Sequence, residues 1–430
     1  MSHPIQRRAF VKQLGAAGAG LLGACGQAPV SEIAPPFDVE ITPITSGPLN
    51  HFFGYIGHVQ NTPWSGDDRF ALALRVGFQD HMPEVHEPAD VILIDMENGY
   101  QIRKLDECRA WNPQQGTMFY WNPDKQSSQF FFNDRDPDTN KVFCVLYDVE
   151  QGRRIREYRD EERPIGNSGV AQNGGSFLGL NYGRLAHLRR VTGYVGAHDF
   201  SEGVLHPDDD GIFKTDIESG KQDLVVSYKQ IADVLAESQP HIEQVPLFIN
   251  HTLWNRDDDR IYFFARGGWS GGGPREERIN SPMTVRPDGT GLTQQSIFIG
   301  GHPEWEFGPN LMGRVADDLV LYDSDKQEIV EEIGSPEVFP DPEGDTSLSP
   351  DGNWIVNGWK EGGGNQYVLY RRSDGAWIHT EIVDQNGYTS GDLRNDPAPT
   401  WNRASNQVLF PSVSSDEGRS RQMYLMRINV

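Results

Sequence analysis

A histidine stands three residues before a tryptophan at two places in this sequence. The first is NHTLWN, with His251 and Trp254, and the second is GHPEW, with His302 and Trp305. In DTSLSPDG, Leu348 takes the place of the tryptophan, and Asp345 stands three residues before it. Two neutral imidazoles and a carboxylate are suitable ligands for a divalent ion such as Zn²⁺ or Mn²⁺, and Ca²⁺ is a further candidate. The alternative is that each histidine only hydrogen-bonds its neighbours.

Cationic side chains recur at a second position, eleven to fourteen residues after the tryptophan or the residue that takes its place. They are Arg75, Arg135, Arg184, Arg266 and Lys360. Arginine binds carboxylate or sulfate through two parallel hydrogen bonds, so several arginines around one cavity are suited to bind a polyanion. The alternative is that each cation pairs with one of the 62 acidic residues on a solvated surface.

Further candidate groups lie beside these motifs in the sequence. His58, Trp111 and Gln115 come shortly before the first two motifs, and Tyr182 follows the third. Tryptophan is suited to stack on a sugar ring, although an isolated aromatic residue more often packs in the interior. We predict catalytic roles for His251, His302, Tyr182 and Arg184; a metal site formed by His251, His302 and Asp345; and substrate binding by Arg75, Arg135, Arg266, Lys360, His58, Trp111 and Gln115.

The motif that carries these side chains repeats seven times. Each copy has an anchor residue, a polar turn and an alternating apolar strand, and a second hairpin follows it. The anchors are Trp64, Trp121, Ala171, Trp254, Trp305, Leu348 and Trp401. Four strands in about 45 residues are typical of one propeller blade. The sequence therefore predicts an all-β fold, a seven-bladed β-propeller, and the alternative is a β-sandwich with a second domain.

Propeller geometry brings the repeated positions together. The innermost strand of a blade starts at one face, here called the upper face, and the second strand returns to it. Residues before each anchor and at the end of each second strand therefore reach the upper face, although they lie far apart in sequence. The last copy ends in a single strand, QMYLMRINV, and we expect FDVEITPIT from Phe37 to complete it and close the ring.

The N-terminal segment has the features of an export signal. Arg7 and Arg8 precede a short apolar run, a pattern that resembles a twin-arginine signal, and LGAC at residues 22–25 resembles a lipobox. The alternative is an ordinary amphipathic N-terminus. We predict a signal over residues 1–25 with lipidation of Cys25, a tether over 26–36 and the propeller over 37–430. The predicted location is the bacterial envelope, in the periplasm or at the outer membrane, with membrane contact through the lipid alone.

Composition restricts the partners and the redox chemistry. The net charge of −24 excludes general electrostatic binding of nucleic acid. Cys108 and Cys144 are too few for a disulfide framework, so we predict that they are buried apolar side chains. We expect no organic cofactor, and no sequence feature indicates a dimer, so we expect a monomer.

Two resemblances extend this interpretation. LSPDG, from Leu348 to Gly352, with the hairpins that follow it, resembles the repeats of TolB-like and WD40-like propellers, which implies the fold but no chemistry. The whole pattern, with NHTLWN, GHPEW and SLSPDG, also resembles the propeller polysaccharide lyases of the oligogalacturonate and ulvan lyase type. That resemblance implies catalysis by histidine with arginine and, in some members, tyrosine, and in oligogalacturonate lyases Mn²⁺ bound by histidines and a glutamine. Their close-set glutamine and histidine ligands are absent around His302.

The concentrated His, Arg and Tyr side chains favour β-elimination from a uronic acid. Arginine or a metal ion neutralises the carboxylate, and histidine or tyrosine removes the weakly acidic proton next to it. We therefore predict a polysaccharide lyase acting on an anionic, uronate-containing carbohydrate, with or without sulfate groups. The alternatives are a non-catalytic propeller that binds a glycan or a protein, and a glycoside hydrolase.

Overall fold

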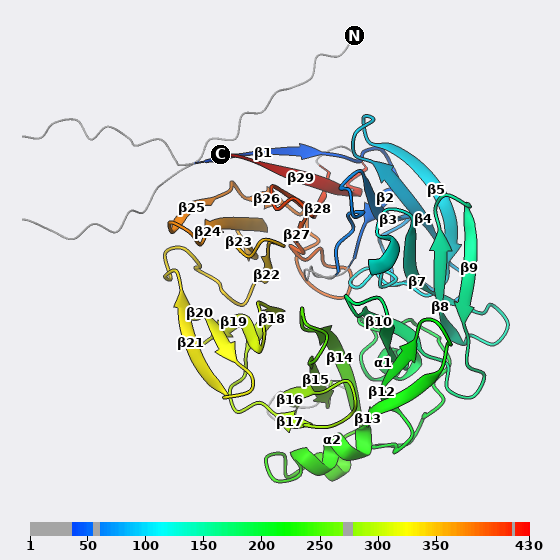
Figure 1. The fold of residues 1–430 in the computed structure, drawn as a ribbon. Helices are drawn as coiled ribbons and strands as arrows, with labels where there is room; N and C mark the ends of the chain where they lie inside the picture. The colour runs from blue at the N-terminus through cyan, green and yellow to red at the C-terminus, as the bar shows by residue number, and fades with distance from the viewer. Residues whose placement is uncertain (1–36, 55–60, 270–277, 415–417) are drawn as a thin grey trace, which may run out of the picture.

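The computed structural model describes residues 37–54, 61–269, 278–414 and 418–430. Within these residues the strands form radial four-stranded antiparallel units around a common axis (Figure 1). Seven such units follow one another around the ring in the described part of the chain. The fold is therefore a seven-bladed β-propeller, as the repeats predict.

The first four blades are consecutive in the chain, and the strands of each blade are named from the axis outward. Blade 1 has β2 (Asn50–Phe52), β3 (Phe70–Val76), β4 (Ala89–Asp95) and β5 (Gln101–Cys108). Blade 2 has β6 (Tyr120–Trp121), β7 (Gln129–Arg135), β8 (Val142–Asp148) and β9 (Arg153–Tyr158). Blade 3 has β10 (Gly166–Val170), β11 (Ser176–Leu180), β12 (Gly211–Asp216) and β13 (Gln222–Ser227). Blade 4 has β14 (Leu247–Trp254), β15 (Ile261–Gly267), β16 (Ile279–Val285) and β17 (Thr293–Gln294).

The remaining blades complete the ring. Blade 5 has β18 (Gly300–Trp305), β19 (Asn310–Val315), β20 (Asp318–Asp323) and β21 (Glu328–Ile333). Blade 6 has β22 (Asp345–Leu348), β23 (Trp354–Glu361), β24 (Gly364–Arg371) and β25 (Ala376–His379), with β26 (Val383–Asp384) also paired to β24. Blade 7 has β27 (Thr400–Trp401), β28 (Gln407–Val413), β29 (Arg421–Asn429) and, from the other end of the chain, β1 (Asp38–Pro43).

Short helices lie in the connections between strands. They are α1 (Tyr182–Leu188), α2 (Tyr228–Leu235), and the 3₁₀ turns η1 (Pro123–Lys125) and η2 (Ile242–Gln244). α2 begins with a capping box, in which the Ser227 side chain and that of Gln230 satisfy each other's backbone amides. In the described residues, no helix is both long and apolar enough to cross a membrane.

The repeated tryptophans join neighbouring blades. The indole of Trp305 donates a hydrogen bond to the Leu253 carbonyl at 3.0 Å, and the indole of Trp401 donates to Ser347 at 3.0 Å. Each acceptor carbonyl lies one residue before the anchor of the preceding blade. A buried indole needs such a partner, and its ring fills the space between two sheets. The repeat that reveals the fold in the sequence is therefore also the contact that holds the blades together.

The ring closes between the two ends of the described chain. β1 pairs with β29 from Asp38 opposite Asn429 to Pro43 opposite Tyr424. Phe37, just before β1, is 3% exposed and packs edge-on against Trp354 of blade 6, with ring centroids 4.8 Å apart. The closure predicted from the sequence is thus confirmed. Cys108 and Cys144 are buried and unpaired, as predicted.

Replacing Phe37 by alanine is expected to lower the free energy of unfolding by about 3 kcal/mol, because it leaves a cavity in the contact that closes the ring. Urea unfolding followed by tryptophan fluorescence measures the change. Ile382→Ala, at a residue that is 47% exposed, is the control and should change stability by less than about 0.5 kcal/mol. Equal effects of the two substitutions would show that closure at Phe37 does not limit stability.

Candidate active site

The innermost strands are distorted at the position three residues before the anchor. β10 has a register shift between Asn167 and Gly169, β14 one between Asn250 and Leu253, and β18 one between Gly300 and Glu304. His251, inside the second of these shifts, has a left-handed φ of 59°. Such bulges turn side chains out of the regular ladder and are common beside active sites. Ser168, His251 and His302 therefore all lie in irregular backbone around the axis.

His302 and Asp345 form a close pair between blades 5 and 6. The two residues are the one parallel pairing recorded between β18 and β22, and Nδ1 of His302 lies 2.6 Å from Oδ1 of Asp345. Burial acts to raise the pKa of Asp345, but the charge and hydrogen bond of His302 and the amide of Ala398, 2.8 Å from Oδ2, together hold this pKa below its usual value. The carboxylate therefore stays ionised and lies against Nδ1 of the imidazole, so Nε2 is the ring nitrogen that does not face it.

His251 lies beside this pair, as predicted from its position in the repeat. Its ring centroid is 5.3 Å from that of His302, and the planes make an angle of 65°. On its other side it meets the Phe264 ring edge-on at 6.1 Å. His251 also lines a small cavity with Gln115 and Tyr182, so three of the predicted site residues meet there.

Three arginines surround Trp269, which follows β15 on the upper face. The Cζ atoms of Arg189, Arg278 and Arg266 lie 4.2, 4.9 and 5.5 Å from the centre of the Trp269 ring system. These three arginines are called the arginine cluster below. Arg266 donates to Asn280 at 2.8 Å and to Asn250 at 3.3 Å. Within the described residues none of the three arginines forms an ion pair with a carboxylate. The cluster is therefore positive; among the described residues the charge of Asp392 acts on Arg189, but without an ion pair.

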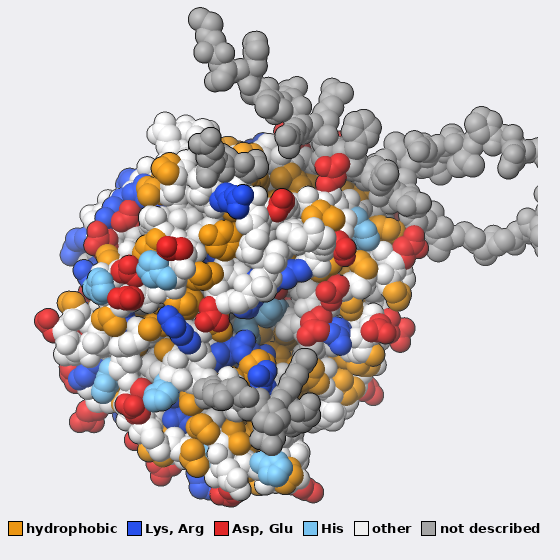
Figure 2. Space-filling model, turned by 180° about the vertical axis from the view of Figure 1, so that it is seen from behind, with side chains coloured by type: hydrophobic (Ala, Val, Ile, Leu, Met, Phe, Trp, Pro, Cys, Tyr) orange, Lys and Arg blue, Asp and Glu red, His pale blue; other side chains and the backbone are white. Residues whose placement is uncertain are grey.

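The arginine cluster is electrostatically strained. Burial, followed by the charge of Arg189, lowers the pKa of Arg266 to about 9. Burial, followed by the charges of Arg394 and Arg278, lowers the pKa of Arg189 to about 10. Both arginines remain charged at neutral pH, and both lowered pKa values mean that the site favours an added anion. Figure 2 shows blue Lys or Arg side chains next to a pale-blue histidine in a depression near the middle of one face.

The arginine cluster and the histidine pair belong to one continuous group of contacts. Cζ of Arg266 lies 4.5 Å from the centre of the Phe264 ring, and Phe264 contacts His251, which contacts His302. On the opposite side of His302, Lys360 helps to lower the pKa of Asp345 and pairs with Asp396 at 3.0 Å. Lys360 thus lies near the site, but its charge is largely neutralised.

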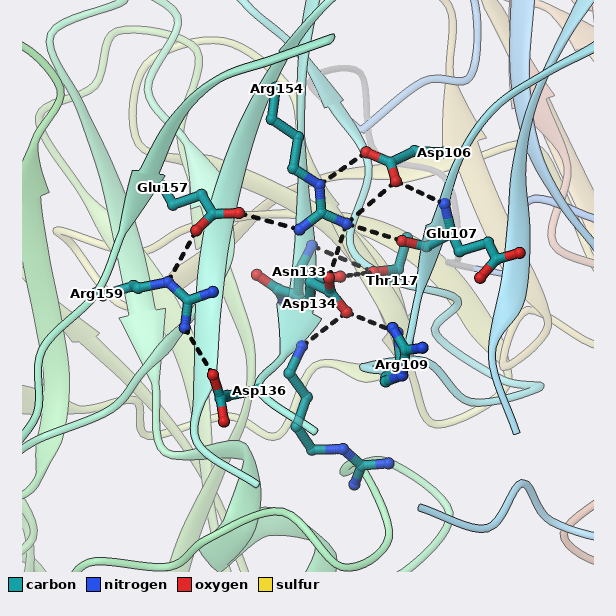
Figure 3. Close-up of polar contacts among 11 residues, drawn as sticks. Asp106, Glu107, Arg109, Thr117, Asn133, Asp134, Asp136, Arg154, Glu157 and Arg159 are labelled. Carbon is teal, nitrogen blue, oxygen red and sulfur yellow. Dashed lines mark hydrogen bonds and ion pairs between the residues drawn. The ribbon is translucent and has the colours of Figure 1, made fainter. Parts of the chain in front are cut away.

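Two of the predicted substrate-binding arginines have partners elsewhere. Arg75 donates to Asp90 through Nε and Nη2 at 3.0 and 2.7 Å. Arg135 is 3% exposed and donates to the carbonyls of Val195 and Val85. The residue before it, Asp134, belongs to an ion-pair network around Arg154 that joins blades 1 and 2 (Figure 3). The geometry offers no support for substrate binding by these two arginines, and that role stays a prediction.

Arg184 is not at the end of a second strand, which corrects the placement predicted from the repeat. It lies in α1, is 2% exposed, and donates to the carbonyls of Leu247, Val204 and Leu205 at 2.7 to 3.0 Å. Blade 3 carries a long insertion after β11, and the arginine anchors that insertion to blade 4. A helix after the strand was not visible in the repeat, because the insertion interrupts the blade pattern.

The aromatic candidates are also held inside the fold. Trp111 is 2% exposed and donates its indole N–H to the Glu87 carbonyl. Tyr182 is 1% exposed, donates to the Asn167 carbonyl at 3.0 Å and stacks on Tyr194. His58 and Cys25 lie outside the described residues, as do the predicted signal and tether. The roles of these residues remain predictions.

The insertion near Arg184 buries an acid whose titration should affect stability. Asp210 is fully buried and accepts hydrogen bonds from Ser201 at 2.6 Å and from Asn181 at 3.0 Å. Burial outweighs these bonds and raises the pKa of Asp210 from 3.8 to about 6. Between these two values the folded state binds the proton more tightly than the unfolded state, so stability falls as the pH rises through this window. The expected loss is about 3 kcal/mol from pH 4 to above pH 6, at roughly 1.4 kcal/mol per pKa unit.

This loss is measured as the difference in unfolding free energy between the wild type and Asp210→Asn, followed against pH. The difference should shift in favour of the variant as the pH rises. Asp209→Asn, a change at the exposed neighbouring residue, is the control, and its difference should stay flat. A flat difference for Asp210→Asn as well would contradict the raised pKa.

The predicted metal ligands do not converge on one point in the described residues. Asp345 contacts Nδ1 of His302, and in this part of the chain there is no group of three His, Cys, Asp or Glu side chains that could hold a metal ion. The arrangement instead matches a carboxylate that orients a histidine. Binding of Mn²⁺, Zn²⁺ or Ca²⁺ stays a prediction, and no step proposed below passes through a metal ion.

The sequence did not indicate that Arg189, Trp269 and Arg278 come together. Arg189 lies in the insertion of blade 3, whereas Trp269 and Arg278 flank the connection between β15 and β16. Both connections join a second strand to a third strand, and in a propeller such connections lie on the upper face. That topological rule was the available signal, but it does not specify which loop residues meet.

Comparison with known proteins finds only distant structural likenesses. No protein-family model and no curated protein matches the sequence. Among solved structures, the chain is similar to the β-propeller domain of the Trilobed protease from Pyrococcus furiosus, with 12% identity, a TM-score of 0.46, and coverage of 87% of this chain and 95% of that chain. It is also similar to TolB from Acinetobacter baumannii, with 11% identity, a TM-score of 0.39, and coverage of 91% and 98%. The β-propeller domain of Myceliophteria thermophila Cps50 (Swd1) has 11% identity, a TM-score of 0.44, and coverage of 86% and 96%.

These likenesses are too distant to carry a function, because one propeller architecture serves many chemistries. None of the three structures named above is a polysaccharide lyase. The lyase interpretation therefore rests on the side chains of the site. The β-propeller itself is established by the strand pairing of this chain.

Proposed function

We propose that the upper face of this propeller binds an anionic carbohydrate and cleaves it by β-elimination. The observation that carries the proposal is the arginine cluster, which has no carboxylate partner in the described residues and lies beside the oriented His302–Asp345 pair. In a chain of net charge −24, a group of unneutralised arginines marks a place for an external anion. A histidine fixed by a buried carboxylate is suited to move a proton.

The proposed reaction uses the groups in the following way. The arginine cluster binds the uronate carboxylate and stabilises the charge that develops on it. Nε2 of His302 takes the proton from the carbon next to that carboxylate, and the electron pair of the C–H bond forms a carbon–carbon double bond. The bond from the neighbouring carbon to the glycosidic oxygen breaks, and protonated His251 donates a proton to that oxygen. Asp345 keeps His302 in the required tautomer throughout.

Tyr182 was predicted to be catalytic, but its hydroxyl already donates to the Asn167 carbonyl and its side chain is 1% exposed. The acid that protonates the leaving oxygen is therefore sought elsewhere. We therefore give this role to His251, whose ring adjoins that of His302. A role of Tyr182 in supporting His251 through their shared cavity is compatible with its position.

The test is incubation of the purified protein with polygalacturonate, alginate and a sulfated glucuronate-containing polysaccharide. A lyase creates an unsaturated product, so ultraviolet absorbance should increase with one of them. New reducing ends without ultraviolet absorbance would instead indicate a glycoside hydrolase. Binding of these glycans without any cleavage would identify the non-catalytic alternative, and either result would overturn the proposed elimination.

We also propose that the protein is exported in the folded state and held at the bacterial envelope by a lipid on Cys25. The support is the order of Arg7, Arg8, the apolar run and the LGAC sequence, all outside the described residues. Cys25→Ala should move the protein from the membrane fraction to the soluble fraction. Recovery of both forms in the soluble fraction would contradict lipidation.

A further inference from the structure

An exposed phenylalanine borders the proposed site. Phe298 lies in the connection between β17 of blade 4 and β18 of blade 5, and 45% of it is exposed. Connections from the outermost strand of one blade to the innermost strand of the next lie on the upper face. Phe298 is therefore on the same face as the arginine cluster and the histidines.

The ring of Phe298 rests on residues that support the proposed chemistry. Its centroid is 5.8 Å from that of Phe264, at an angle of 42°. Phe264 in turn contacts the His251 ring and lies under the guanidinium of Arg266. A Cβ atom placed on Gly300 would lie 3.4 Å from the Phe298 ring, so the ring also covers the first residue of β18, two positions before His302. The Phe264 ring thus connects Phe298 to Arg266 of the arginine cluster and to His251.

A single exposed aromatic side chain is ordinary on a protein surface. A second phenylalanine, Phe307, shows the ordinary case: it is 49% exposed, lies in the first hairpin turn of blade 5 on the lower face, and packs under Arg256 at 4.6 Å. Phe298 differs because its exposed ring packs on Phe264, which itself contacts His251 and Arg266. A ligand held there by its anionic group would place its next atoms against an apolar surface.

We infer that Phe298 is a platform for a pyranose ring of the ligand and selects carbohydrate over other anions. The inference rests on the proposed function and deepens it, because the arginine cluster alone would accept any anion of suitable size. One face of a pyranose carries mainly C–H groups, which pack on a phenyl ring and remove both surfaces from water. The structure thus assigns charge recognition to the arginine cluster and ring recognition to Phe298.

The experiment compares two probes by isothermal titration calorimetry: sodium sulfate, which carries charge alone, and a galacturonate trisaccharide, which carries charge and sugar rings. Phe298→Ala should weaken trisaccharide binding about tenfold and leave sulfate binding unchanged. Phe298→Tyr retains the aromatic face and should bind the trisaccharide like the wild type. Phe307→Ala is the matched control and should change neither affinity.

The outcomes separate this inference from the proposed function. Unchanged trisaccharide affinity in Phe298→Ala would overturn the platform and leave the proposed function intact. Equal weakening for both probes would also overturn it, because the side chain would then act by supporting the arginine cluster. If the wild type binds sulfate but no uronate oligosaccharide of any of the three polysaccharides, the proposed function and the platform both fail.

Discussion

Replacing His302 by glutamine is expected to lower the turnover of a uronate-containing substrate by about 10²- to 10⁴-fold, the range typical of losing a general base. Glutamine keeps a polar side chain of similar reach that can hydrogen-bond Asp345 but cannot take a proton at neutral pH. Affinity for sulfate should change little, because the arginine cluster is intact. The measurement is the initial rate of ultraviolet absorbance increase together with sulfate calorimetry.

Asp345→Asn separates positioning from proton transfer. The imidazole remains, but the buried carboxylate that holds its Nδ1 at 2.6 Å is lost, and loss of such orienting partners typically costs 10- to 100-fold. The variant should therefore lie between the wild type and His302→Gln, with the larger change in kcat. His86→Gln, at a side chain that is 78% exposed, is the control and should keep full activity. Full activity in His302→Gln would remove this residue from the mechanism.

Replacing Arg189 by glutamine is expected to weaken anion binding about 10- to 100-fold, the value of a charge-assisted hydrogen bond. The same change should leave the melting temperature of the free protein unchanged or raise it. Arg189 has no ion pair in the described residues, and the charges of Arg394 and Arg278 oppose its own. Removing it relieves this repulsion, whereas removing a structural arginine would lower the melting temperature.

Two measurements check this prediction: sulfate or uronate affinity by calorimetry, and thermal unfolding with and without sulfate. In the wild type, sulfate should raise the melting temperature, because a ligand that binds only the folded state stabilises it. That rise should be smaller in Arg189→Gln and unchanged in Arg190→Gln, a substitution at the exposed neighbour. Equal sulfate effects in all three proteins would show that the arginine cluster does not bind anions.

The fold was predictable because the same strand and turn pattern recurs in every blade, with a tryptophan anchor in five of the seven. A tryptophan must fill the space between two sheets and satisfy its indole N–H, as Trp305 and Trp401 do. The seventh blade was also predictable, because a single strand at the C-terminus leaves an edge that β1 covers. These patterns are local and are typical of one fold, so a single sequence is enough to recognise them.

The candidate site was predictable in part. His251, His302 and Asp345 meet because they occupy equivalent positions of neighbouring innermost strands, and a closed ring brings such positions together around the axis. The same argument failed for Arg184, which the insertion of blade 3 takes out of the repeat and into α1. It also missed the roles within the group: Asp345 contacts His302 and orients it, which no spacing could specify.

The sequence by itself determined the propeller, its closure and the register that gathers the histidines, because these follow from periodic patterns of apolar, aromatic and turn residues. Only the tertiary structure decided which cations gather together without an ion pair in the described residues. Arg75 and Arg135 are satisfied by Asp90 and by backbone carbonyls, whereas Arg189, Arg266 and Arg278 gather around Trp269. Whether a charge is neutralised depends on the groups within a few ångströms of it. At this site those groups come from loops that do not follow the repeat.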